Sequence, residues 1–218
     1  MENSSKPTVA IIGLGNIGQA IAANLVQGNR PIIVADRNTD KAQELAGKWG
    51  SLAQPLGIGA AIEAADIVIL AVWFSAIKEL LYQYEGVLRG KIIIDPSNPI
   101  APNATGGFDK IIGEHESAGQ LNAALLPQGA KLAKALGTLG VASLVNAAFQ
   151  KPEPAVLFYA VDDDGIRAAI EQLIRDTGFE PLWVGGLEQS IRIEVFGDLH
   201  EFGALGKTVT LSEVHLAA

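Results

Sequence analysis

The sequence predicts a doubly wound α/β fold, in which helices cover both faces of a mostly parallel sheet. Three observations support this. Short runs of branched apolar residues recur along the chain, helix-like stretches separate them, and a glycine-rich turn joins the first run to the first helix. Continuous rather than alternating apolarity is typical of strands that are buried on both faces, as in a parallel sheet.

The expected elements alternate along the chain. Seven apolar runs are expected to be strands: residues 9–13, 31–36, 66–72, 91–99, 131–136, 155–161 and 181–186. The expected helices are residues 17–27, 39–49, 75–84 and 164–177. Together they form an α/β core over residues 8–186, and we expect residues 1–218 to be a single domain.

Two segments break this alternation. Residues 101–128 are irregular and are expected to form a long excursion, whose role the sequence leaves open. Apolar residues recur at helical spacing from 187 to 206, which predicts a C-terminal helix followed by a tail over 207–218. Apolar residues exposed on that helix also favour a homodimer.

The composition excludes several classes of protein. The net charge is -8 and the 16 basic residues are scattered, which argues against a nucleic-acid partner. The absence of cysteine excludes disulfides and thiolate chemistry. The polar start "MENSSKPT" does not read as a signal peptide, and no apolar run approaches the ~20 residues that span a bilayer. We therefore expect a soluble cytoplasmic protein without membrane contact.

The glycine-rich turn reads "GLGNIG", and its six residues are the first candidate cofactor-binding residues: Gly13, Leu14, Gly15, Asn16, Ile17 and Gly18. It follows the first expected strand and opens the first expected helix, as in the Rossmann dinucleotide-binding motif. Gly13 permits a tight turn, Gly15 leaves room for a pyrophosphate, and Gly18 allows close helix–strand packing. Free N–H groups at the helix start then face the anion. The alternative is a turn selected for packing alone.

Three residues bear on the choice of dinucleotide: Asp36 ends the second expected strand, and Arg37 and Lys41 follow it. A carboxylate at Asp36 suits the ribose hydroxyls of NAD and repels a 2'-phosphate. Arg37 and Lys41 suit the 2'-phosphate of NADP. The choice between NAD and NADP stays open at this point, as does a simple surface role for the three side chains.

The ends of two further strands supply the remaining candidates. Ala71, Val72 and Trp73 end the third long run, and aromatic Trp73 and Phe74 are suited to cover the nicotinamide ribose. The segment "DPSNP" ends the fourth run, where Pro96 and Pro99 stiffen the loop. Asn98 is the candidate for orienting the carboxamide or an acceptor ring, because an amide both donates and accepts hydrogen bonds. Ordinary turn or core packing is the alternative for all of them.

The chain resembles the family of NADP oxidoreductases that use the deazaflavin coenzyme F-420, and related dinucleotide-binding reductases. The resemblance runs from Val9 to about Gly206 through "GLGNIGQAIA", "ADRNTDKAQELA", "ADIVILAVWFSAIKELL", "GKIIIDPSNPI", "KALGTLG" and "DDDGIRAAIEQLIRDTGFEPLWVGGL". It implies that the Arg37–Lys41 loop meets the 2'-phosphate, "AVWF" lines the nicotinamide half and "DPSNP" lies at the nicotinamide ring. The chain departs from the family at Asp36, where a small residue is usual, and at Gly137, where asparagine is common.

Acid–base candidates are few. His200, beside Glu201, is the candidate general acid. Lys131 and Lys134 are expected to be solvated at a strand end; the alternative is burial, which would lower their pKa values. Neither a metal motif nor a hydrolase triad is present in the sequence. Hydride transfer between two rings requires no fixed proton donor, so we expect an NAD(P)-dependent oxidoreductase with a small-molecule flavin- or deazaflavin-like partner. The alternatives are a reductase of a small carbonyl or imine and a non-catalytic NAD(P) sensor.

Overall fold

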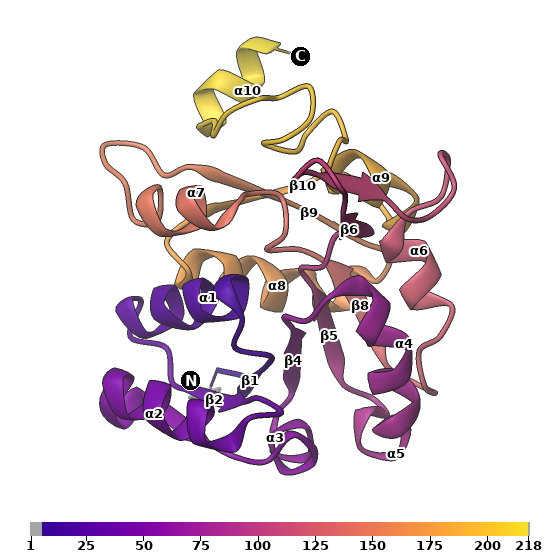
Figure 1. Ribbon diagram of the computed structural model, residues 1–218. Coiled ribbons are helices and arrows are strands. Elements are labelled where there is room, and N and C mark those ends of the chain that lie inside the picture. The colour runs from indigo at the N-terminus through magenta and orange to yellow at the C-terminus, as the bar shows by residue number, and fades with distance from the viewer. Residues whose placement is uncertain (1–5, 218) are drawn as a thin grey trace.

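The computed structural model describes residues 6–217, with side chains to residue 214. Its centre is an eight-stranded sheet (Figure 1). The strand order across the sheet is β10 (Glu180–Trp183), β9 (Val156–Val161), β8 (Lys131–Lys134), β5 (Ile92–Asp95), β4 (Ile67–Leu70), β1 (Val9–Ile12), β2 (Ile32–Ala35) and β3 (Ala53–Pro55). The predicted doubly wound, mostly parallel sheet is confirmed.

The order of the strands reverses around β1. This strand pairs in parallel with β2 on one side and with β4 on the other. In sheets of this kind a crevice forms outside the carboxyl ends of the strands where the order reverses, and ligands bind there. The far edge differs, because β9 runs antiparallel to β8 and β10 runs parallel to β9. The sequence does not reveal this antiparallel junction.

Helices pack on both faces because alternate strand residues point to opposite sides. One face is covered by α1 (Asn16–Gln27), α2 (Thr39–Trp49), α7 (Val141–Asn146) and α8 (Asp164–Asp176). The other is covered by α3 (Ile58–Ala64), α4 (Phe74–Gln83), α5 (Glu85–Leu88) and α6 (Ala118–Ala123). All four predicted helices are confirmed, each with its bounds shifted by at most one residue. Among the helices described, none is long and apolar enough to cross a bilayer.

The excursion contains regular structure that its irregular composition hides. A two-stranded antiparallel hairpin pairs β6 (Ile100–Pro102) with β7 (Phe108–Lys110), and α6 follows it. The hairpin is held by its own polar contacts, such as Asn103, which accepts hydrogen bonds from the backbone N–H groups of Thr105 and Gly107. It extends from the carboxyl end of β5 toward the edge of the molecule (Figure 1).

The predicted continuous helix over 187–206 is wrong. A 3-10 turn, η2 (Leu187–Gln189), and one turn of helix, α9 (Ser190–Ile193), are followed by turns. Gly197 and Gly203 make close backbone contacts there, since a Cβ on Gly203 would lie 1.8 Å from the oxygen of Gly197. A second helix, α10 (Leu211–Ala217), occupies the segment expected to be a tail. The homodimer inferred from the longer helix stays a prediction.

Candidate functional site

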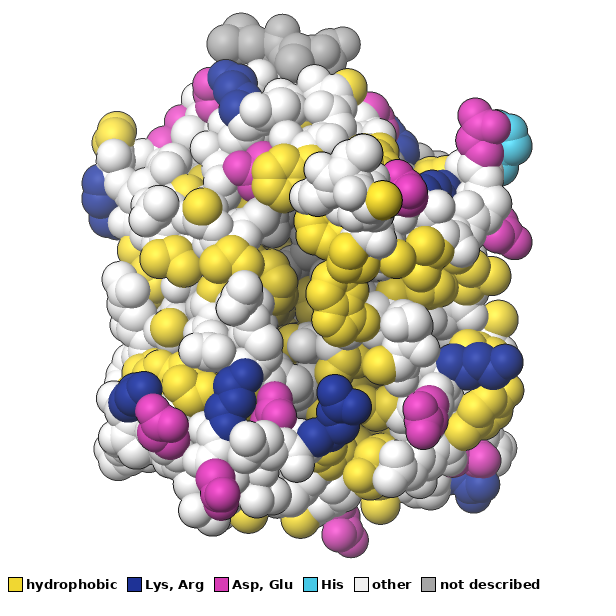
Figure 2. Space-filling model, viewed as in Figure 1, with side chains coloured by type: hydrophobic (Ala, Val, Ile, Leu, Met, Phe, Trp, Pro, Cys, Tyr) yellow, Lys and Arg dark blue, Asp and Glu magenta, His cyan; other side chains and the backbone are white. Residues whose placement is uncertain are grey.

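The predicted residues converge on the carboxyl ends of β1, β2, β4 and β5. These strands are neighbours in the sheet, and the loops that follow them meet on one side of it. Figure 2 shows a hollow near the centre of the viewed face, with hydrophobic side chains on both of its sides. In sheets of this kind, ligands bind at the loops that follow such strands.

The glycine loop has the close packing that its motif predicts. Gly13 has a φ of 95°, and a Cβ there would lie 2.5 Å from the backbone oxygen of Ala71. A Cβ on Gly18 would lie 2.0 Å from the oxygen of Gly13. Both positions exclude any side chain, so the tight turn expected at Gly13 and the close packing expected at Gly18 are confirmed.

Gly15 differs from its two neighbours in the motif. A Cβ at this position would meet nothing within 4 Å, and its φ of -65° suits any residue. Neither backbone geometry nor internal packing explains this glycine. Gly15 is also the N-cap of α1, and no side chain caps that helix end, although α2 and α8 are capped by Asn38 and Asp163. The start of α1, with Asn16 and Ile17, thus offers uncapped N–H groups to an anion.

Asp36 is turned toward the protein rather than away from it. Its Oδ2 accepts a hydrogen bond of 2.7 Å from the backbone N–H of Leu14, and its Oδ1 accepts one of 2.9 Å from Asn38. The carboxylate therefore ties the end of β2 to the glycine loop. Arg37 is exposed and Lys41 is half-buried, four residues along the same turn and helix.

The end of β4 carries an exposed aromatic residue. Ala71 and Val72 lie against Gly13, whereas Trp73 is 56% exposed just before α4. The Trp73 ring lies 6.4 Å from the ring of Phe108 in β7, centroid to centroid. The excursion therefore borders the candidate site, and the two rings form an apolar surface beside it.

The loop after β5 is fixed by internal hydrogen bonds. The Asn98 side chain donates to the oxygen of Gly137 at 3.0 Å and accepts from the N–H of Val195 at 2.7 Å. Pro96 is in direct contact with Gly137, where a Cβ would lie 2.4 Å from the Pro96 oxygen. This contact leaves no room for a side chain at position 137. Asn98 joins three segments, and its role toward a carboxamide stays a prediction, as does that of Pro99.

His200 has the contacts of a structural residue. The side chain is buried, its Nε2 lies 3.0 Å from the oxygen of Gly137, and its Nδ1 accepts a hydrogen bond from the N–H of Phe202. Burial lowers the pKa of His200 to about 4. Glu201 is likewise engaged, with Gly140 and Ser143. A neutral imidazole with both nitrogens bonded to backbone is poorly placed to donate a proton to a substrate.

The expectation that Lys134 is solvated is wrong. Its side chain is 3% exposed, and its Nζ lies 3.2 Å from Oδ2 of Asp95 on the neighbouring strand. Glu194, after α9, is also buried nearby. Lys131, three residues earlier on β8, has the exposed position expected and pairs with Asp163. The apolar run around Lys134 was the available signal, because it indicates a strand that is buried on both faces.

Comparison with known proteins agrees with this geometry. Residues 8–99 match the family described as NADP oxidoreductase coenzyme F420-dependent. The F420-dependent NADP reductase of Methanothermobacter thermautotrophicus is 26% identical over 197 residues, which cover 85% of this chain and 84% of that protein. Metalloreductase STEAP3 of Rattus norvegicus is 26% identical over 191 residues, 86% of this chain but 36% of that protein. The chain thus spans about a third of that relative's length.

A solved structure extends the similarity to almost the whole chain. A hypothetical protein from Sinorhizobium meliloti superposes with a TM-score of 0.80 at 26% identity. The match covers 93% of this chain and 95% of the other. Most of this chain therefore has a counterpart in that structure.

Proposed function

Because residues 8–99 match the coenzyme F420-dependent NADP oxidoreductase family, we propose that the chain is an NADP-dependent enzyme that transfers hydride between nicotinamide and a flat ring partner. A deazaflavin or a flavin is the partner class. The observation that carries the proposal is the glycine loop. Gly13 and Gly18 are explained by packing, whereas the open face of Gly15 leaves room for a ligand to approach the backbone.

The start of α1 fits the diphosphate of a dinucleotide. The uncapped N–H groups beside Gly15 are donors for phosphate oxygens, and the helix dipole favours negative charge at this end. The bound group supplies the hydride at its nicotinamide ring. The chain's own contribution is to hold that ring near Trp73 and the loop of residues 95–99, at the carboxyl ends of β4 and β5.

The side chains after β2 favour NADP over NAD. Asp36 is already bonded to two backbone N–H groups, so its oxygens are partly engaged away from a ribose. Arg37 is exposed and suited to bind a 2'-phosphate in a bidentate manner, with Lys41 as a second cation. The engaged carboxylate and the exposed guanidinium together support a 2'-phosphate pocket at this loop.

The proton chemistry favours a ring acceptor over a carbonyl. Reduction of a carbonyl requires a donor within hydrogen-bond reach of the developing alkoxide, and the candidate donor His200 is buried and fully bonded. A flavin or deazaflavin ring spreads the charge that it receives. The chain then has only to align the two rings at ~3–3.5 Å and exclude water. The apolar surface of Trp73 and Phe108 suits such a ring.

Binding measurements test the first step. Calorimetry with NADPH and NADH should show tighter binding of NADPH to the wild-type chain. Gly15→Ala should still fold, since the added Cβ meets no protein atom and alanine at an N-cap costs about 1 kcal/mol, but it should bind NADPH at least about 10-fold more weakly. Gly47→Ala is the matched control, because this exposed glycine of α2 also has nothing within 4 Å. Equal binding by both variants would contradict the proposed diphosphate position.

Turnover measurements test the second step. The protein is mixed with whichever of NADPH and NADH binds more tightly, and deazaflavin, flavin, carbonyl and imine acceptors are added in turn. Oxidation of the nucleotide is followed by its absorbance. Transfer to a ring acceptor supports the proposal. Turnover of a carbonyl or imine alone favours the small-substrate reductase. Tight binding without oxidation by any acceptor favours a sensor.

A further inference from the structure

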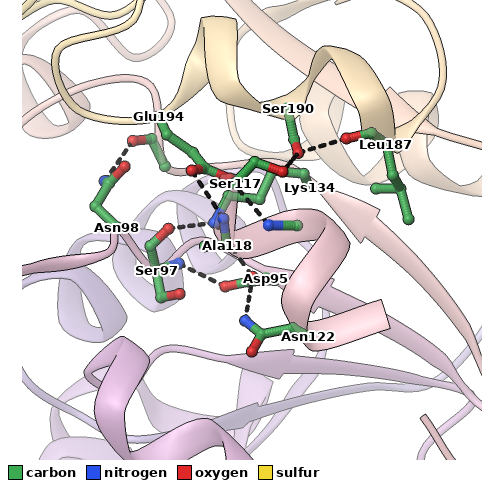
Figure 3. Close-up of polar contacts among 12 residues, drawn as sticks. Asp95, Ser97, Asn98, Ser117, Ala118, Asn122, Lys134, Leu187, Ser190 and Glu194 are labelled. Atoms are coloured by element: carbon green, nitrogen blue, oxygen red, sulfur yellow. Dashed lines mark hydrogen bonds and ion pairs between the residues drawn. The ribbon is translucent and has the colours of Figure 1, made fainter. Parts of the chain in front are cut away.

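Three charged side chains are buried together behind the loop of residues 95–99. Asp95 ends β5, Lys134 ends β8 and Glu194 follows α9, and each residue is at most 2% exposed. Figure 3 shows them between the loop and α6. Segments far apart in the sequence thus bring two carboxylates and one ammonium group into one buried region.

Every charge in this cluster has a defined partner. Lys134 Nζ is paired with Asp95 Oδ2, which also accepts a hydrogen bond of 2.9 Å from the side-chain amide of Asn122. Glu194 accepts hydrogen bonds of 2.9 and 3.0 Å from the N–H groups of Ala118 and Gly119. Buried ion pairs contribute little net stability compared with apolar packing, although breaking one is costly. A contribution to stability alone therefore does not explain why these charges are buried together.

The contacts of the cluster converge on the backbone of one residue, Ser97. The N–H of Ser97 donates to Asp95 Oδ1 at 2.8 Å, and the Ser97 oxygen accepts a hydrogen bond from Lys134 Nζ (Figure 3). The pair thus holds both backbone polar groups of Ser97. Asn98 then joins the same loop to Gly137 and Val195.

We propose that Lys134 is a positioning residue, which fixes the Ser97 carbonyl and through it the surface on which the nicotinamide ring lies. This inference rests on the proposed function. Lys134 is too deeply buried to touch the ring, so it acts through Ser97. A displacement of about 1 Å in a reacting group can reduce a rate about 100-fold, which makes the shape of this loop consequential.

The central test compares a single with a double variant. Lys134→Met leaves Asp95 buried without its counter-charge and should be strongly destabilised. Asp95→Asn combined with Lys134→Met removes both charges, while an amide oxygen at residue 95 still accepts from Ser97. The double variant should regain most of the wild-type stability in urea. It should bind NADPH within about threefold of wild type, because the diphosphate end is unchanged, yet transfer hydride at least about 10-fold more slowly.

Two controls separate positioning from a structural role. Lys131→Met removes the exposed partner of Asp163 on the same strand and should leave stability, affinity and rate unchanged. The fluorescence spectrum of bound NADPH reports the surroundings of the nicotinamide ring without any acceptor. It should shift in the double variant and remain unchanged in Lys131→Met.

The outcomes are distinct. A double variant that regains both stability and the wild-type rate, with an unshifted NADPH spectrum, would overturn the positioning role. Reduced affinity with an unchanged rate would overturn it as well, because Lys134 would then contribute to binding alone. Failure of the wild-type chain to bind NADPH would overturn the proposed function before any variant is compared.

Discussion

The dinucleotide half of the candidate site, at β1 and α1, is built mainly of backbone, whereas the half beside β5 and β8 is built mainly of side chains. In the first half, Gly13 and Gly18 bring backbone atoms together, and the helix start presents N–H groups. In the second, Lys134, Asn98 and Glu194 bond to backbone groups on other segments. A backbone site needs few contacts between distant residues. A side-chain site depends on them throughout.

The difference concerns how each half tolerates change. In the glycine loop, no side chain fits at Gly13 or Gly18, whereas a Cβ at Gly15 would meet no protein atom within 4 Å. The half beside β5 and β8 is held by hydrogen bonds between residues far apart in the sequence. The bond between Asn98 and Val195, whose numbers differ by 97, is an example. We therefore expect the first half to fail through steric clash and the second through loss of individual bonds.

The largest effect is expected at Gly18. A Cβ here would lie 2.0 Å from the backbone oxygen of Gly13, and neither atom is on a flexible side chain. Gly18→Ala should lower the free energy of unfolding by about 4 kcal/mol, beyond the usual range of overpacking, because backbone has to move. Urea denaturation measures this loss, and calorimetry should detect no NADPH binding. Wild-type stability in this variant would show that the loop is less tightly packed than the comparison requires.

A smaller effect is expected from His200 in the side-chain half. Burial depresses its pKa from 6.5 to about 4, so the unfolded chain takes up a proton between these pH values while the folded chain does not. Stability from this residue is complete above about pH 6.5 and is lost as the pH falls toward 4, amounting to about 3 kcal/mol.

His200→Gln provides the comparison for that pH dependence. The glutamine amide can still donate to the Gly137 oxygen but does not titrate. Urea midpoints measured from pH 7 to pH 4 should fall more steeply for wild type than for the variant. Parallel curves would mean that the imidazole is not buried in the neutral form. Ring-to-ring transfer at pH 7 should persist in the variant, since His200 has no acid role in the proposed reaction.

The same comparison explains what the sequence could predict. The glycine loop and the buried strands are encoded by neighbouring residues, so the pattern located them correctly. The environment of Lys134 depends on Asp95 in another strand and on Glu194 beyond α9, and no local pattern reports such contacts. The prediction of a helix beyond Ile193 was wrong because apolar spacing does not report how the backbone packs. The apolar residues of this segment have helical spacing, but Gly197 and Gly203 pack backbone against backbone and end the helix.

The smallest effect is expected at Arg37 in the dinucleotide half of the site. We expect this exposed side chain to determine the preference for NADPH over NADH. Arg37→Gln should weaken NADPH binding about 10-fold, or roughly 1.4 kcal/mol, and leave NADH binding unchanged, because only NADPH carries the 2'-phosphate. Calorimetry at fixed ionic strength measures both, since salt screens exposed charges. Lys48→Gln is the control, because this exposed lysine of α2 pairs with Glu44.

The response of NADH decides how this half of the site works. Equal weakening of both nucleotides would mean that Arg37 acts through general electrostatic attraction rather than by contact with the 2'-phosphate. Tighter binding of NADH than NADPH by the wild-type chain would mean that Asp36 releases the N–H of Leu14 and binds the ribose instead. Selective loss of NADPH affinity would support a structural role for Asp36, in which its carboxylate holds the backbone of the glycine loop by hydrogen bonds and does not bind the ribose.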